Sequence, residues 1–278
     1  MVKKILVLGA TGMLGLPVAN HLLERGKQVR VLARHREKAK QMLGEKVEII
    51  EGNASNREDI RKAVKGCNAV HLSLPQEVEF AAMQHVIEFG TGLERITYIS
   101  ATTAFEANRW FDLIDTKLRT EEILCASGIA NTIFCPTWAM ETLKNFVHEN
   151  RAFIILSSNP PRIHFLAAGD LGKMVAASYE DTRAVGKKLF IHGPEKMQLP
   201  DALKHFINSC YPKEKIMQMK LWQAQLLANL GNRKKLKEAT KLIAYFDKVG
   251  ELGDPSEANS LLGAPNTTLE KWIERQKS

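Results

Sequence analysis

The amino-acid sequence predicts an α/β protein: a doubly wound parallel sheet with a smaller, mostly helical C-terminal lobe. Three observations lead to this prediction. The short apolar run Ile5–Leu8 leads straight into glycines at positions 9, 12 and 15, and helix-forming residues follow. Short apolar runs then alternate with helical patterns as far as Pro136, which is typical of a parallel sheet with helices on both faces. After Pro136 the alternation stops and helical patterns dominate.

The first part of the chain is expected to alternate strictly between strand and helix. Strands are predicted at the apolar runs 5–8, 28–33, 47–51, 69–74, 95–100 and 131–135. Helices are predicted between them, at 13–25, 36–43, 56–64, 76–89 and 112–126. Gly26 ends the first helix, Pro75 and Pro136 end strands, and Ser55 with Glu58 has the spacing of a capping box.

The second part is expected to be richer in helix. Strands are predicted at 163–166 and 188–192, and helices at 170–178, 200–209, 216–249 and 268–272. We expect residues 1–155 to form the sheet domain, with strand 188–192 returning to it. Residues 156–278 are expected to form mainly the helical lobe.

The composition is that of an ordinary globular protein. Of 278 residues, 45% are hydrophobic and 25% charged, and no apolar run approaches the ~18 residues of a membrane span. Because the N-terminus leads directly into a strand, we expect no signal peptide. Cys67, Cys125, Cys135 and Cys210 lack paired spacing, which favours reduced thiols and a cytoplasmic location.

Positive charge is concentrated in one segment. The formal net charge is +8, and between Lys213 and Lys248 there are nine Lys or Arg residues but three Asp or Glu residues. We expect these charges to lie on helices without interleaved exposed aromatics. That favours a solvated helix face, with an anionic partner as the second interpretation. Nucleic-acid binding rests on this segment alone and is not expected.

The glycine-rich turn after the first strand predicts a dinucleotide-binding site. Glycines permit a tight turn and a close approach of backbone to a pyrophosphate, and the helix N-terminus offers free N–H groups and partial positive charge. The alternative is a turn that only joins a strand to a helix. We expect cofactor contacts from Gly9, Thr11, Gly12, Met13, Leu14 and Gly15.

The end of the second strand indicates which dinucleotide is bound. In NAD-binding proteins of this kind an acidic residue there accepts a hydrogen bond from the ribose 2′-hydroxyl. This chain has Arg34 at that place, and a guanidinium pairs with a 2′-phosphate. The sequence therefore predicts NADP(H) over NAD(H), the alternative being a basic helix start in solvent. Topology adds further expected cofactor contacts at strand ends: Asn53, Ser73, Leu74, Ser100 and Pro136.

Several motifs together resemble one protein family. The GATGMLG turn over 9–15, Arg34, the ISATT segment over 99–103 and the helix with Lys117 resemble the atypical short-chain dehydrogenase/reductases. The closer resemblance is to the NmrA-like group, NAD(P)-binding proteins with a Rossmann fold. The tail FDKVGELGDPSEANSLLGAP, residues 246–265, is similar to that of bacterial members. The resemblance covers essentially the whole chain.

The resemblance implies catalytic residues, with one departure. The wider superfamily uses a Ser or Thr, a Tyr and a Lys, and this pattern places Thr102 and Lys117 at the first and last of these positions. The Tyr is expected four residues before Lys117, where this chain has Leu113. A leucine cannot transfer a proton, so we expect Lys117 and Thr102 to act without it.

Three functions remain open at this point. The first is a reductase whose hydride transfer needs no Tyr, as the resemblance implies for quinone reductases. The second is a sensor that binds NADP(H) without turnover and contacts a protein partner. In the third, Asp112, Asp115 or Tyr98 replaces the Tyr, although a surface role for the aspartates and a core role for Tyr98 are favoured.

An apolar pocket is the expected substrate site. Trp138 and Met140 lie near Phe146 in the sequence, and with His164 they are our expected substrate contacts. No spacing of His, Cys or Asp indicates a metal, and His71 is interpreted as a core residue. The sequence predicts an NADPH-dependent reductase of a small aromatic or quinone-like substrate, with the NADP(H) sensor as the alternative.

Overall fold

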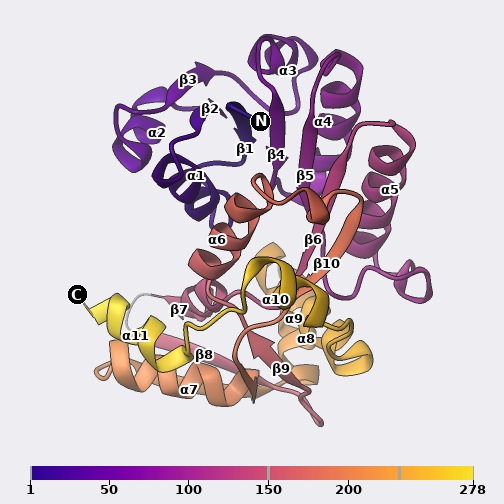
Figure 1. Cartoon of the computed structure of the whole chain (residues 1–278). Helices are drawn as coiled ribbons and strands as arrows, with labels where there is room; N and C mark the ends of the chain where they lie inside the picture. The colour runs from indigo at the N-terminus through magenta and orange to yellow at the C-terminus, as the bar shows by residue number, and fades with distance from the viewer. Residues whose placement is uncertain (1, 149–150, 231–232, 278) are drawn as a thin grey trace. The chain divides into compact units, whose positions relative to one another are not determined.

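The computed structural model describes residues 2–148, 151–230 and 233–277 (Figure 1). The chain forms two compact units. One comprises Met1–Pro136, Ala168–Ile191 and Asp254–Ala264, and the other Thr137–Ala167, His192–Gly253 and Pro265–Ser278. The chain leaves the first unit after Pro136 and returns to it twice, at Ala168 and at Asp254.

The first unit is built on a seven-stranded parallel sheet with the order β10-β6-β5-β4-β1-β2-β3 (Figure 1). The predicted doubly wound sheet is therefore confirmed. The order reverses between β1 and β4, and in open α/β sheets ligands bind at such a point, beyond the carboxyl ends of the strands. The strands are β1 (Lys4–Leu8), β2 (Gln28–Ala33), β3 (Glu48–Glu51), β4 (Ala69–Leu72), β5 (Arg95–Ile99), β6 (Asn131–Pro136) and β10 (Lys187–Ile191).

Helices cover both faces of this sheet. They are α1 (Gly15–Glu24), α2 (Arg36–Leu43), α3 (Arg57–Val64), α4 (Gln76–Phe89), α5 (Asp112–Ala126), α6 (Ala168–Ser178) and α10 (Ser256–Leu262). Helix α4 packs between α3 and α5, whereas α1 packs against α2 and α6. From β1 to β3 the chain moves toward one edge of the sheet, and from β3 to β6 it moves toward the other edge. Because each crossover is right-handed, α1 and α2 cover one face of the sheet, and α3, α4 and α5 cover the opposite face.

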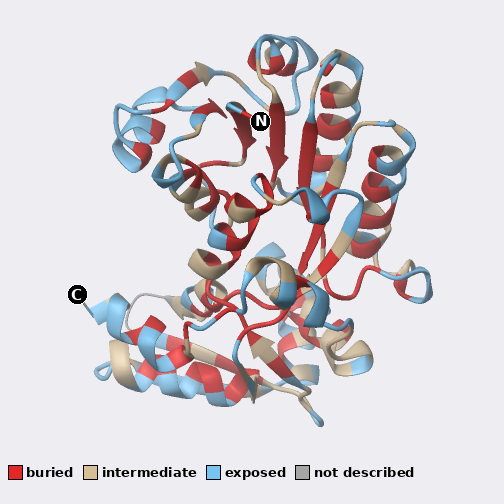
Figure 2. Ribbon diagram, viewed as in Figure 1, coloured by how far each residue is buried: buried red, intermediate tan, exposed pale blue. Residues whose placement is uncertain are grey.

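Burial on both faces of the sheet explains why the central strands do not alternate between apolar and exposed polar residues. Every residue of β4 and β5 is buried (Figure 2), because helices cover both sides of the sheet. His71 on β4 is fully buried, and its Nδ1 lies 2.8 Å from Thr97 Oγ1. Burial lowers the pKa of His71 to about 3, so this histidine is neutral and belongs to the core.

In the described residues of the second unit there are two small sheets and four α-helices. The sheets have the orders β12-β8-β7 and β11-β9, and a core that includes Phe165, Phe206 and Trp272 holds the unit together. The strands are β7 (Val147–His148), β8 (Arg151–Leu156), β9 (Arg162–Phe165), β11 (Glu195–Gln198) and β12 (Lys215–Lys220). The helices are α7 (Leu199–Cys210), α8 (Leu221–Asn229), α9 (Lys234–Val249) and α11 (Leu269–Lys277).

The structure corrects two local predictions. The predicted helix over 216–249 begins as strand β12, which pairs in parallel with β8; this long-range pairing outweighs local helical preference. Gly231 and Asn232, inside the same predicted helix, lie outside the described residues. The cap of α3 is Asn56, not Ser55, because the Asn56 side chain accepts hydrogen bonds from the N–H groups of Glu58 and Asp59.

The basic segment also differs from expectation, because it exposes large apolar side chains. Trp222 on α8 is 59% exposed and Leu230 is 76% exposed. The expectation of no interleaved exposed aromatic is therefore wrong for this segment. Among the described residues, none of the helices has the length and apolar character needed to cross a bilayer.

Candidate functional site

The turn between β1 and α1 is held by close backbone packing. Gly9 has φ +88°, and a Cβ at this position would lie 2.0 Å from the carbonyl oxygen of Ser73. A Cβ at Gly15 would lie 2.2 Å from the carbonyl oxygen of Gly9. Neither place admits a side chain, so both glycines are required for this turn. The turn is closed by the Gly12 N–H, which donates to Gly9 O at 2.8 Å.

The turn presents polar backbone at the start of α1. Helix α1 begins after Leu14 without a side-chain cap, and the N–H groups of a first helical turn lack intrahelical acceptors. Gly12 and Met13 are exposed, and Thr11 is half-buried. The arrangement offers backbone donors and the positive end of a helix dipole to an anion.

Two further predicted contacts lie against this turn. Ser73 and Leu74 follow β4, and the Ser73 N–H donates to Leu8 O at 3.1 Å. The contact of Ser73 O with Gly9 thus joins the carboxyl ends of β1 and β4. The structure therefore brings Gly9, Ser73 and Leu74 together at the point where the strand order reverses.

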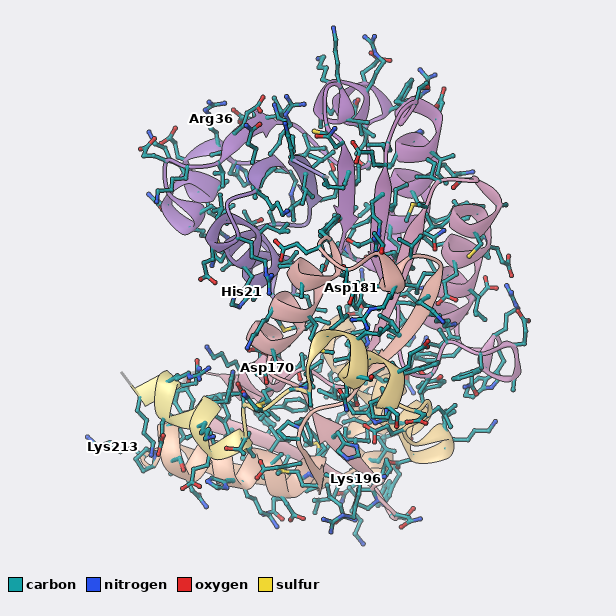
Figure 3. All side chains as sticks on the ribbon, viewed as in Figure 1. His21, Arg36, Asp170, Asp181, Lys196 and Lys213 are labelled. Atoms are coloured by element: carbon teal, nitrogen blue, oxygen red, sulfur yellow. The ribbon has the colours of Figure 1, made fainter. Side chains whose placement is uncertain are left out.

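Arg34 follows β2 directly and is exposed. Within the described part of the chain its guanidinium has no hydrogen-bond or ion-pair partner. The nearby Arg36 (labelled in Figure 3) differs, because its guanidinium donates to Ile49 O at 2.9 Å. Asn53 is exposed, and its Oδ1 accepts a hydrogen bond from the Ser55 N–H, which leaves its amide nitrogen available. Arg34 is therefore a cation that the fold itself does not use.

Lys117 lies in a buried ion pair that the sequence did not reveal. Its Nζ donates to Glu79 Oε2 at 2.7 Å and to Ile99 O at 2.9 Å. Glu79 on α4 is fully buried. The lysine also lies over the ring of Tyr98, 5.1 Å from its centroid. These contacts hold the amine at the carboxyl end of β5.

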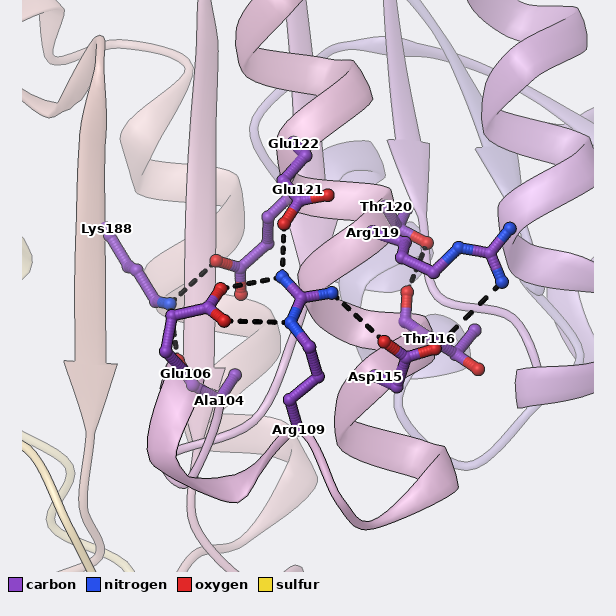
Figure 4. Close-up of polar contacts among 10 residues, drawn as sticks. All are labelled: Ala104, Glu106, Arg109, Asp115, Thr116, Arg119, Thr120, Glu121, Glu122 and Lys188. Atoms are coloured by element: carbon purple, nitrogen blue, oxygen red, sulfur yellow. Dashed lines mark hydrogen bonds and ion pairs between the residues drawn. The ribbon is translucent and has the colours of Figure 1, made fainter.

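Thr102 and Ser100, the predicted residues that follow β5, also make hydrogen bonds within the fold. Thr102 is buried, and its N–H donates to Pro136 O at 3.2 Å. Ser100 Oγ donates to the carboxylate of Glu121, which also pairs with Lys188 Nζ at 2.6 Å (Figure 4). Sequence reasoning missed Glu79 and Glu121, since nothing in a single helix marks which carboxylate faces a strand end.

Two of the substitutes considered for the absent tyrosine have other contacts or surroundings. Asp115 pairs with Arg109, 3.0 Å away, and with Arg119 (Figure 4). Tyr98 is fully buried, and burial raises its pKa well above the ordinary value. Leu113 lies half-buried on α5, one turn before Lys117.

The predicted substrate contacts lie in the second unit. Trp138 packs on Phe246, with ring centroids 4.9 Å apart, and lines a cavity of about 20 Å³. Met140 is fully buried in the core of this unit. His164 is half-buried, and its Nδ1 lies 2.5 Å from Glu251 Oε2. Glu251 was not anticipated from the sequence, because it lies far from His164 along the chain.

Comparisons with known proteins match the whole length of the chain. The model of the NmrA-like family matches residues 1–273. An NADPH-dependent quinone oxidoreductase from Escherichia coli, solved with NADPH, has a TM-score of 0.79 at 20% identity, covering 99% of this chain and 100% of that one.

Two other solved structures are similar. A triphenylmethane reductase from Citrobacter sp., solved with NADP(H), has a TM-score of 0.78 at 17% identity. A nucleoside-diphosphate-sugar epimerase from Staphylococcus aureus has the same TM-score and identity. Each alignment covers 98% of this chain and 99% of the other. A search of curated proteins finds no match. At these identities the structural likeness establishes the fold.

The buried ion pair leads to a stability prediction. Lys117→Met leaves the Glu79 carboxylate buried without its cation, and should lower the free energy of unfolding by ~3–5 kcal/mol. The double variant Lys117→Met/Glu79→Met removes the stranded charge and should recover most of that loss. Urea denaturation followed by circular dichroism measures both, with Lys173→Met on the exposed face of α6 as the matched control. Equal destabilisation of single and double variants would contradict this interpretation.

Proposed function

The chain belongs to the NmrA-like family, and from this premise we propose that it is an NADPH-dependent reductase of a small aromatic or quinone-like substrate. The observation that carries the proposal is the turn of residues 9–15, whose glycines pack against the end of β4 and leave backbone donors at the start of α1. That geometry suits a pyrophosphate. In the proposal, Gly9, Thr11, Gly12, Met13, Leu14 and Gly15 hold it.

Arg34 supports the preference for NADP(H) over NAD(H). It is an exposed guanidinium at the end of β2, and the described residues offer it no anionic partner. A 2′-phosphate supplies an anion that a guanidinium binds with two parallel hydrogen bonds. Asn53 is proposed to contact the adenine through its amide nitrogen.

The nicotinamide end is proposed to lie at the carboxyl ends of β4, β5 and β6. When bound, the nicotinamide supplies the hydride. Ser73, Leu74, Ser100 and Pro136 are the proposed contacts, and Lys117 with Thr102 orients the ribose and the substrate oxygen. Glu79 and Ile99 O hold the amine of Lys117 in place, so its proposed task is positioning and hydrogen-bond donation. Such orientation favours direct hydride transfer without an acid at position 113.

The substrate is proposed to be flat and apolar. In the proposal, the substrate stacks on the ring of Trp138, which packs on Phe246, and His164 would add one polar contact. Met140 packs in the same core. Similar structures include a quinone oxidoreductase and a triphenylmethane reductase, whose names indicate quinone and triphenylmethane substrates. A cytoplasmic location is part of the proposal, and the four free cysteines support it.

A sensor that binds NADP(H) without turnover is the second candidate. It is favoured by Leu113 at the tyrosine position and by the engagement of Lys117 with Glu79. In that case the cofactor-binding residues keep their roles and a protein partner replaces the substrate.

Turnover distinguishes the two candidates. The protein should oxidise NADPH in the presence of quinones or triphenylmethane dyes, followed by the loss of the near-ultraviolet absorbance of NADPH. A reductase gives substrate-dependent oxidation that falls when Thr102 is replaced by Val. Tight NADPH binding without turnover across quinones, dyes and simple carbonyls would contradict the reductase and support the sensor.

Arg34 gives the sharpest test of cofactor choice. Arg34→Asp should weaken NADPH binding by roughly 10–100-fold, because a charge-assisted hydrogen bond contributes ~1.5–3 kcal/mol, while NADH binding should change little. Lys38→Asp, an exposed site on α2 with the same change of charge, is the matched control. Calorimetric titration with both dinucleotides measures the effect. Equal losses for NADPH and NADH, or an equal effect of the control, would refute the assignment.

A further inference from the structure

The carboxylate of Glu251 is buried in the second unit and firmly held. Its side chain is only 3% exposed. Its Oε1 accepts hydrogen bonds from the His164 backbone N–H at 2.8 Å and from Thr137 Oγ1 at 2.7 Å. These two donors fix the orientation of the carboxylate. Its other oxygen, Oε2, faces the rings of His164 and His192.

Two histidine rings present the same nitrogen to that second oxygen. Glu251 Oε2 lies 2.5 Å from His164 Nδ1 and 3.9 Å from His192 Nδ1. The two rings stack, with centroids 5.1 Å apart and an angle of 24° between their planes. One ligand atom from each of the three residues lies within 4.8 Å of the other two.

The second contact of His192 determines which of its nitrogens carries the proton. Its Nε2 lies 3.2 Å from the carbonyl oxygen of Leu252. A carbonyl only accepts, so Nε2 must be the donor. In a neutral ring this leaves a lone pair on Nδ1.

A bare nitrogen lone pair therefore faces a carboxylate oxygen across 3.9 Å. Two hydrogen-bond acceptors cannot form a hydrogen bond with each other. A cation placed between them would bind both. His164 adds a second imidazole nitrogen beside the same oxygen. Two imidazoles and one carboxylate are a ligand set that suits Zn²⁺ and related transition metals.

We propose that His164, His192 and Glu251 form a binding site for one divalent transition-metal ion of the Zn²⁺ type. Tetrahedral metal–ligand distances of ~2.0–2.2 Å place ligand atoms about 3.4 Å apart, so His164 Nδ1 would move away from Glu251 Oε2 and His192 Nδ1 would move toward it. In the metal-bound form the His164 ring would carry its hydrogen on Nε2, so that Nδ1 can bind the ion. Thr137 and the Leu252 carbonyl then act as the outer partners that orient the carboxylate and the His192 ring.

Lys196 is the competing cation at this place. Its Nζ lies 3.9 Å from Glu251 Oε2, but its side chain is 49% exposed and lies at the surface of the unit (Figure 3). An exposed ammonium can turn into solvent when a metal neutralises the carboxylate. Without metal, Lys196 offers a cation to this carboxylate.

The ligands join three separate segments of the second unit. His164 belongs to β9, His192 follows β10 in the sequence, and Glu251 follows α9. A bound ion would therefore tie these segments together and stabilise the folded state, because the unfolded chain does not hold the ligands together. The site shares His164 with the proposed substrate contacts, but Zn²⁺ binding is measured without cofactor or substrate, so its outcome is separate from that of the reductase test.

Titration of metal-depleted full-length protein with Zn²⁺ tests the proposal. Calorimetry should show one ion bound per chain, and Zn²⁺ should raise the melting temperature. Co²⁺ should give visible absorption bands that report the ligands directly. Glu251→Gln keeps the size of the side chain and should weaken Zn²⁺ binding at least ~10-fold. His192→Gln should weaken it similarly.

The exposed histidine His205 provides the matched control, since His205→Gln should leave Zn²⁺ binding unchanged. Circular dichroism of each variant verifies the fold. Failure of the wild-type protein to bind one Zn²⁺ per chain would overturn the proposal without reference to any variant. Binding that survives both Glu251→Gln and His192→Gln, or that His205→Gln abolishes, would overturn it as well.

Discussion

The approach of Gly9 to the carbonyl of Ser73 is the constraint on which the first unit depends. A Cβ at Gly9 would come within 2.0 Å of that oxygen, so the ends of β1 and β4 meet only because residue 9 lacks a side chain. The same packing turns the chain into α1 through Gly15 and leaves the helix start uncapped. The proposed pyrophosphate site is thus a consequence of how two neighbouring strands end.

Buried charge shapes the rest of the candidate site. Glu79 holds Lys117, and Glu121 links Ser100 to Lys188, so the polar groups near the carboxyl ends of β5 and β6 are tied to one another. An ion pair in this setting positions its members more than it stabilises the fold. In the second unit, Glu251 gathers His164 and His192 in the same manner. In each case one buried carboxylate determines where its neighbours point.

The sequence was sufficient for features that repeat or lie close together along the chain. Apolar runs located the strands of the large sheet, and the glycine spacing located the turn at its reversal point. It was insufficient where distant segments meet. Strand β12 forms because β8 lies beside it, and no local pattern distinguishes Glu79 or Glu251 from a surface carboxylate. The proposed metal ligands escaped notice for that reason, since they come from three separate segments.

Hydrogen exchange of backbone amides, measured by mass spectrometry with and without NADPH, tests the central claim most directly. If the turn holds the pyrophosphate, NADPH should slow exchange over residues 9–16 and at Arg34, because the bound anion accepts hydrogen bonds from these N–H groups. NADPH that binds but leaves exchange over residues 9–16 unchanged would contradict the account.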